Sequence, residues 1–163
     1  MSPLSPTIGE LLEALDMSRE RVSNLLRSVY DRQDWQPAPD EWSFRYIAAH
    51  MAQVELDAVL ARAKALAANT TPHYSYYLNT GWDFSEFDML ESLELWQERR
   101  AELTQFVEGL TAEQLFDYRG THDYFDVITV QRVLEIALDH DLEHERDLQQ
   151  TLAVNRELQG AMP

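Results

Sequence analysis

The sequence predicts an all-α protein, built as a four-helix antiparallel bundle with a long connection between its second and third helices. Four long segments repeat apolar residues about every 3.6 positions, which is typical of helices with one buried face. No segment of comparable length alternates apolar and polar residues as a half-buried strand does. There is no internal repeat and no interdomain linker, so we expect one domain over residues 1–163.

The first two helices are predicted from their apolar stripes and their starting residues. Thr7 can accept a hydrogen bond from a free amide group, and a stripe of leucine, isoleucine and valine follows over residues 8–30. The second segment, residues 40–68, opens with acidic residues, whose charge suits the positive end of a helix dipole. A linker that contains prolines separates the two helices.

A long connection, residues 69–84, is expected next, because a proline and a glycine interrupt the helical pattern. Aromatic residues are frequent in it, so we expect it to fold onto the bundle. The third helix is predicted to begin after Ser85, whose side chain can cap it in a box-like pair with Asp88. It is predicted to end near Gly109, because glycine is the common residue after a helix.

The last part of the chain contains one short and one long helical segment. Residues 111–114 repeat the capping signature and predict a short helical turn. A second connection, residues 118–126, is rich in glycine, aspartate and aromatic residues. The fourth helix is predicted to begin near Asp126 or Thr129 and to run to about Arg156.

The charge balance bears on the class of partner. The chain has 13 basic and 29 acidic residues, a net charge of −16. Because Lys64 is the only lysine and the arginines are scattered, we expect no nucleic-acid partner. No uncharged apolar stretch approaches the roughly 20 residues of a membrane span, so we expect no membrane partner. Because the chain lacks cysteine, any metal must be held by histidines and carboxylates, and we expect a cytoplasmic protein.

Two of the five histidines lie four residues apart in the fourth helix. Side chains at this spacing stack on one face, about 5–6 Å apart at Cβ, so His140 and His144 can bind one ion. At about 100° per residue, both share an arc with Val133, Ala137 and Leu148. Both imidazoles are therefore expected to face the core.

His50 supplies a third candidate ligand, because it lies at the flank of the apolar stripe of the second helix. A single inward histidine is usually an ordinary core residue whose hydrogen bonds are satisfied. Three buried imidazoles without partners would cost about 1–3 kcal/mol for each unsatisfied group, whereas a shared divalent ion satisfies one nitrogen of each ring. We therefore expect a metal site made by His50, His140 and His144.

Three other kinds of catalytic site fit the residues less well. The segment from His140 to His144 matches the inverted zincin pattern His-x-x-Glu-His, but Glu143 lies about 100° from the direction of His144, towards the rim of the stripe. A di-iron carboxylate bundle needs paired Glu-x-x-His motifs, and Asp141-x-x-His144 stands alone. Ser-His-Asp chemistry is not supported, because the chain has no Gly-x-Ser-x-Gly elbow.

Taken together, these features resemble the DinB/YfiT-like family of metalloenzymes. The resemblance spans roughly residues 7–156. It is carried by the inward histidine of the second helix, the His-x-x-x-His pair of the fourth, and a polar-aromatic linker that leads into a Thr-Val-x-x-Val-Leu helix start. His50 matches the family's second-helix ligand, and His140 and His144 match its fourth-helix pair.

The resemblance implies a divalent transition metal, typically nickel or zinc, held by three histidines with water in the remaining positions. Three protein ligands with an open position are also typical of catalytic zinc sites. Related branches of the family are transferases or isomerases that use low-molecular-weight thiols such as bacillithiol or mycothiol. No signature for binding a thiol or a substrate is readable in this chain.

We therefore expect a metal-dependent enzyme, a transferase or a hydrolase, that activates a thiol or water towards a small-molecule substrate. A low-molecular-weight-thiol S-transferase is one form of this hypothesis. The alternative is a non-catalytic, stress-associated bundle that binds a metal or a small ligand, as a homodimer through an exposed face. A metal-free helical interaction module is a third reading. The sequence identifies no catalytic residue beyond the metal ligands.

Other residues are candidates for supporting roles. An acidic side chain near the site could accept a hydrogen bond from the second ring nitrogen of a ligand, although most acids of such a chain lie on solvated faces. His73 and His122 could line an entrance over the metal, but we expect surface loop positions for both. The acidic candidates are Glu55, Asp88, Asp139 and Asp141; the aromatic residues that could wall a pocket are Tyr76, Tyr77 and Trp82.

Overall fold

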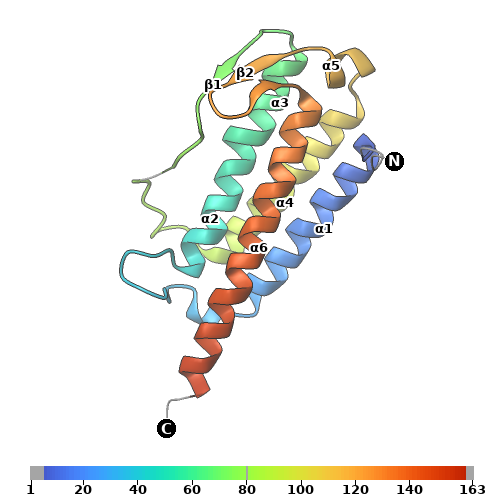
Figure 1. Cartoon of the computed structure of the whole chain (residues 1–163). Helices are drawn as coiled ribbons and strands as arrows, with labels where there is room; N and C mark the ends of the chain where they lie inside the picture. Colours follow the sequence, from blue (N-terminus) through green and yellow to red (C-terminus); the bar gives the residue numbers. More distant parts are fainter. Residues whose placement is uncertain (1–5, 80, 161–163) are drawn as a thin grey trace, which may run out of the picture.

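The computed structural model describes residues 6–79 and 81–160, and it confirms the predicted four-helix bundle (Figure 1). Helices α1, α2, α4 and α6 form the bundle, and α2 continues through a π-helical segment, η2, into α3. The helical elements are α1 (Ile8–Arg27), η1 (Tyr30–Arg32), α2 (Phe44–Val54), η2 (Glu55–Leu60), α3 (Ala61–Ala67), α4 (Met89–Glu108), α5 (Ala112–Phe116) and α6 (Val130–Gly160).

Two bundle helices run in each direction. In Figure 1, α1 and α6 descend, whereas α2 and α4 ascend. Because α2 and α4 run the same way, the connection between α3 and α4 returns along the length of the bundle before α4 begins. This return path explains the long connection that the sequence predicts, and it brings aromatic residues alongside α2 and α6.

The predicted helix caps are confirmed except at α4. Thr7 and Thr111 each form a capping box, with Glu10 and Gln114 respectively. The prediction that Ser85 caps α4 is wrong, because Asp88 is the N-cap and its carboxylate accepts hydrogen bonds from the backbone amides of residues 90 and 91. The chain therefore turns once more before the helix. As a result, Phe87 lies before the helix and is 46% exposed.

Three short strands, which the sequence analysis did not predict, lie within the two long connections. They are β1 (His73–Tyr74), β2 (Gly120–His122) and β3 (Asp126–Ile128). Strand β1 pairs in parallel with β2, and β2 pairs antiparallel with β3. Two or three residues are too few for a period-two pattern to be visible. Gly120 allows β2 to lie close to the residue that precedes β1, because a Cβ atom on Gly120 would lie only 2.5 Å from the carbonyl oxygen of Pro72.

The core is made by the apolar stripes of the four helices. It falls into two clusters along the bundle, one at the end near α3 and α5, the other nearer the chain end of α6. Met89 and Trp96 are fully buried in the second cluster, as helix periodicity predicts for core residues. In the described part of the chain, no helix combines the length and apolar character needed to cross a membrane.

Candidate metal centre

Helices α2 and α6 bring the three predicted histidines together. His50 comes from α2, and His140 and His144 come from successive turns of α6. The Nε2 atom of His140 lies 3.2 Å from that of His50 and 3.1 Å from that of His144. Over residues 6–79 and 81–160, this is the one group of at least three metal-binding side chains close enough to share an ion.

The spacing of the three nitrogen atoms suits a transition metal. With metal–nitrogen bonds of about 2.0–2.1 Å, two ligand nitrogens lie about 3.3 Å apart at a tetrahedral angle and about 2.9 Å apart at a right angle. The two separations that involve His140, 3.1 and 3.2 Å, lie within this range, and all three ligand atoms lie within 4.8 Å of one another. All three rings turn Nε2 towards one another, so each can offer this nitrogen to one ion.

Burial keeps the three imidazoles uncharged. Together with the charge of a protonated His144, it lowers the pKa of His50 to about 4. Burial also lowers the pKa values of His140 and His144. Neutral imidazole is the form that binds a metal, so the site is prepared for an ion at neutral pH.

Asn79 fixes the orientation of His50. Its side-chain oxygen accepts a hydrogen bond from Nδ1 of His50 at 3.0 Å, which places the ring proton on Nδ1 and leaves the lone pair of Nε2 free. Trp42 packs on the same ring, with centroids 4.6 Å apart, and its centroid lies 5.9 Å from that of His144. Sequence analysis missed both residues, because each lies outside the helices and neither belongs to a recognisable motif.

The histidines open into a cavity of about 430 Å³, a size typical of small-molecule sites. One wall is the continuous helix α2–η2–α3, a second is α6, and a third is the pair of connections that contain the short strands. Most of the lining is aliphatic or aromatic. The aliphatic residues of α6 that contribute to it are Val133, Ile136 and Ala137.

The loop candidates differ in their positions. Tyr76 and Tyr77, two of the candidate pocket residues, line the cavity. The Tyr77 hydroxyl also donates to Asp57 at 2.7 Å, which ties the connection to η2. Trp82 is exposed and is not part of the lining. His122 is buried against the cavity, so the expectation of a surface position is wrong for it. That expectation is correct for His73, which is exposed.

The four acidic candidates do not orient the histidines by hydrogen bonding in the described residues. Asp88 caps α4 instead, and it accepts from Tyr30 and Gln33. Asp139 lines the cavity and forms no side-chain hydrogen bond with the described residues. Glu55 and Asp141 are buried, contrary to the solvated positions expected for most acids, because both bind Arg100.

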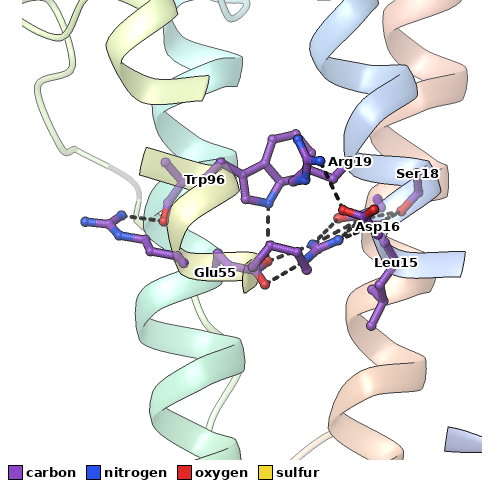
Figure 2. Close-up of polar contacts among 10 residues, drawn as sticks. Leu15, Asp16, Ser18, Arg19, Glu55 and Trp96 are labelled. Carbon is purple, nitrogen blue, oxygen red and sulfur yellow. Dashed lines mark hydrogen bonds and ion pairs between the residues drawn. The ribbon is translucent and has the colours of Figure 1, made fainter. Parts of the chain in front are cut away.

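This buried ion cluster lies one residue along α6 from His140. Arg100, 1% exposed, donates to Glu55 at 2.6 and 2.7 Å and to Asp141 at 3.1 Å. Figure 2 shows Trp96 donating to Glu55 on one side, and Leu15 and Ser18 of α1 on the other. The cluster therefore joins α1, η2, α4 and α6 at one level of the bundle.

Known proteins match both the sequence and the fold. The sequence profile of the DinB superfamily matches residues 31–148. Among solved structures, YfiT from Bacillus subtilis superposes with a TM-score of 0.73 at 21% identity, covering 97% of this chain and 93% of that one. YfiT is described as a probable metal-dependent hydrolase with an unusual four-helix bundle topology. No curated protein sequence matches the chain.

Proposed function

The chain belongs to the DinB superfamily, and on that basis we propose that it is a metal-dependent enzyme, with hydrolysis of a small molecule as its leading activity. One observation carries the proposal: three Nε2 atoms converge at the wall of a largely apolar cavity. The description of YfiT, which has the same fold, as a probable metal-dependent hydrolase supports this reaction class.

His50, His140 and His144 are the proposed metal ligands. We propose zinc or nickel, because imidazole is a favoured ligand of both ions. A divalent ion held by three imidazoles lowers the pKa of a coordinating water or thiol towards neutrality and so supplies a nucleophile.

The remaining chemistry falls to side chains of the cavity. Its apolar walls exclude bulk water from the substrate, which strengthens electrostatic interactions at the reacting atoms. Asp139, Glu143 and Asp147 line the cavity on the same helix as two of the ligands. We propose that an acid of this group accepts the proton released by the nucleophile, because the charges of Asp147 and Glu143 both act on the pKa of His144.

Thiol transfer is the second candidate function, and the same cavity supports it. The space beside the histidines is large enough for an external molecule, and the chain has no cysteine of its own. A thiol nucleophile would therefore arrive as a co-substrate, such as a low-molecular-weight thiol.

The two functions are separated by assaying the zinc-loaded protein against a panel of activated esters and amides, and against monochlorobimane with several low-molecular-weight thiols. Hydrolysis without thiol, lost in His144→Ala, supports the leading proposal. Turnover that requires a thiol, again lost in His144→Ala, supports transfer instead. If zinc binds stoichiometrically and neither reaction occurs, the catalytic proposal fails and a non-catalytic metal-binding bundle remains. His73→Ala is the matched control, because this histidine is exposed and lies outside the cavity.

A further inference from the structure

Arg62 is a cation of the cavity wall that no carboxylate of the described chain neutralises. Its Nη2 donates to the carbonyl oxygen of Ser75 at 3.1 Å, and its guanidinium lies over the ring of Tyr74 at 4.5 Å. Within the described residues it takes part in no ion pair. In a chain of net charge −16, a half-buried arginine without an acidic partner is unexpected.

Most N–H donors of the Arg62 guanidinium have no hydrogen-bond partner among the described residues. Arginine carries five N–H groups, and Ser75 takes one of them. None of the remaining nitrogen atoms of Arg62 is among the sealed, unpartnered polar atoms of the described structure, so these donors stay accessible. A planar fork of free N–H groups in a cavity is suited to bidentate recognition of a carboxylate.

The π-helix places Arg62 on the same face as His50. The two residues are twelve positions apart, so in an uninterrupted α-helix they would point about 120° away from each other. A π-helical turn takes up one additional residue, which turns the following segment back by about 100°. The remaining difference is about 20°, and His50, Val54, Ala58 and Arg62 accordingly all line the cavity.

Arg62 and the histidines lie at opposite ends of the cavity. Twelve residues rise about 18 Å along a helix, and helical side chains lean towards the N-terminus, so Arg62 reaches back in the direction of His50. Between the two ends the lining is apolar, with Val54, Ala58 and Ile136 among its residues. A ligand that fills the cavity therefore meets a polar site at each end and an apolar wall between them.

The charge at the Arg62 end of the cavity suits a monoanion. His122 also lines the cavity, and its Nδ1 accepts hydrogen bonds from the backbone amides of Tyr124 and Phe125. Burial, reinforced by the charge of Arg62, lowers the pKa of His122, so this imidazole adds no positive charge at neutral pH. One guanidinium balances one carboxylate, whereas a phosphate dianion would leave uncompensated negative charge in an acidic protein.

We propose that Arg62 binds the carboxylate of a small apolar acid whose reactive group lies beside His50, His140 and His144. The inference rests on the proposed function for the reacting end, and it adds the substrate class, an amphipathic carboxylic acid. In this assignment Arg62 is a specificity-determining residue that acts on binding and does not touch the reacting atoms.

The test compares phenylalkanoic acids of increasing chain length with their primary amides by isothermal titration calorimetry, on zinc-free and zinc-loaded protein. We expect the best acid to bind about tenfold or more tightly than its amide, because only the acid forms a charged, hydrogen-bonded pair with Arg62. Arg62→Gln should abolish this preference and leave amide binding and zinc content unchanged. Arg62→Lys should retain part of it, and Arg119→Gln, an exposed control with the same charge change, should retain all of it.

Each remaining outcome counts against the proposal. It is overturned if acid and amide bind equally, if no acid binds at millimolar concentration, if Arg62→Gln keeps the preference, or if the phosphonate analogue binds more tightly than the carboxylate. Circular dichroism checks that the variants are folded. If zinc does not bind at all, the proposed function fails, yet the comparison on zinc-free protein still tests Arg62 independently.

Discussion

Asn79 illustrates how a single residue can prepare a site. Its side-chain oxygen accepts a hydrogen bond from the Nδ1–H of His50, which leaves the Nε2 lone pair facing the other two histidines. The histidines themselves were predictable, because helix periodicity alone places them on inward faces. Asn79 was not, because the path of a long connection depends on tertiary packing that has no periodic signature.

At this scale we predict that Asn79→Ala weakens zinc binding about 10–100-fold while all three ligands remain, because the partner of a ligating imidazole sets its orientation and basicity. Affinity is measured by competition with a chromophoric chelator. Asn24→Ala, at an exposed position of α1, is the control and should bind zinc as the wild type does. Equal affinity in both variants would show that Asn79 does not position His50.

The lowered pKa of His50 predicts a pH dependence of stability in the metal-free protein. This pKa is 6.5 ordinarily and about 4 in the folded chain, so between these pH values the unfolded chain binds more protons. The free energy of unfolding should therefore fall as the pH drops from 6.5 towards 4, with a contribution from His50 of up to about 3 kcal/mol.

His50→Gln removes that contribution and leaves the other titrating groups in place. Urea unfolding of both proteins in the presence of a chelator gives the difference directly. The stability advantage of the wild type should shrink as the pH is lowered through this window. A difference that stays constant with pH would contradict the neutral, buried state of His50.

At the scale of elements, the helix faces were predictable and their interruptions were not. The 3.6-residue period located all four bundle helices, since it reflects burial of one face. The π-helix at Glu55–Leu60 could not be predicted from this period. The residues that flank it, Val54 and Ala61, are ordinary helix residues, so nothing in the sequence marks the change of helix type. At α4 the local sequence predicted Ser85 as the cap, whereas the N-cap is Asp88, three residues later.

Substituting Asp88 and Ser85 in turn tests which residue caps α4. Asp88→Ala should lower the free energy of unfolding by about 1–2 kcal/mol, because Asp88 accepts from two free amides of α4 and also from Tyr30 and Gln33. Ser85→Ala is the matched control and should change stability by less than about 0.5 kcal/mol. Denaturant titration measures both. A larger loss in Ser85→Ala than in Asp88→Ala would reverse the assignment of the cap.

At the scale of the whole molecule, the buried cluster of Glu55, Arg100 and Asp141 ties the bundle together beside the candidate metal centre. One guanidinium serves two carboxylates that are each 2% exposed. Burial, reinforced by the charge of Glu55, raises the pKa of Asp141 to about 6. Sequence periodicity placed Glu55 and Asp141 only as acids near histidines, because nothing local links them to an arginine more than forty residues away.

We predict that Arg100→Met destabilises the protein by about 3–5 kcal/mol, because it leaves two buried carboxylates without their cation. Arg146→Met, at an exposed position on α6, is the control and should have little effect. Thermal and denaturant unfolding give the free energies. A loss as small as that of the control would mean that the cluster does not hold the four helices together.

The proposed function depends on one divalent ion shared by α2 and α6. Elemental mass spectrometry of protein purified without added metal tests this most directly, on the wild type beside His50→Ala, His140→Ala, His144→Ala and the control His73→Ala. We predict about one zinc or nickel per chain in the wild type and in the control, and loss of the ion in each of the other three variants. A wild type that carries no metal and takes none up on titration at neutral pH would contradict the account.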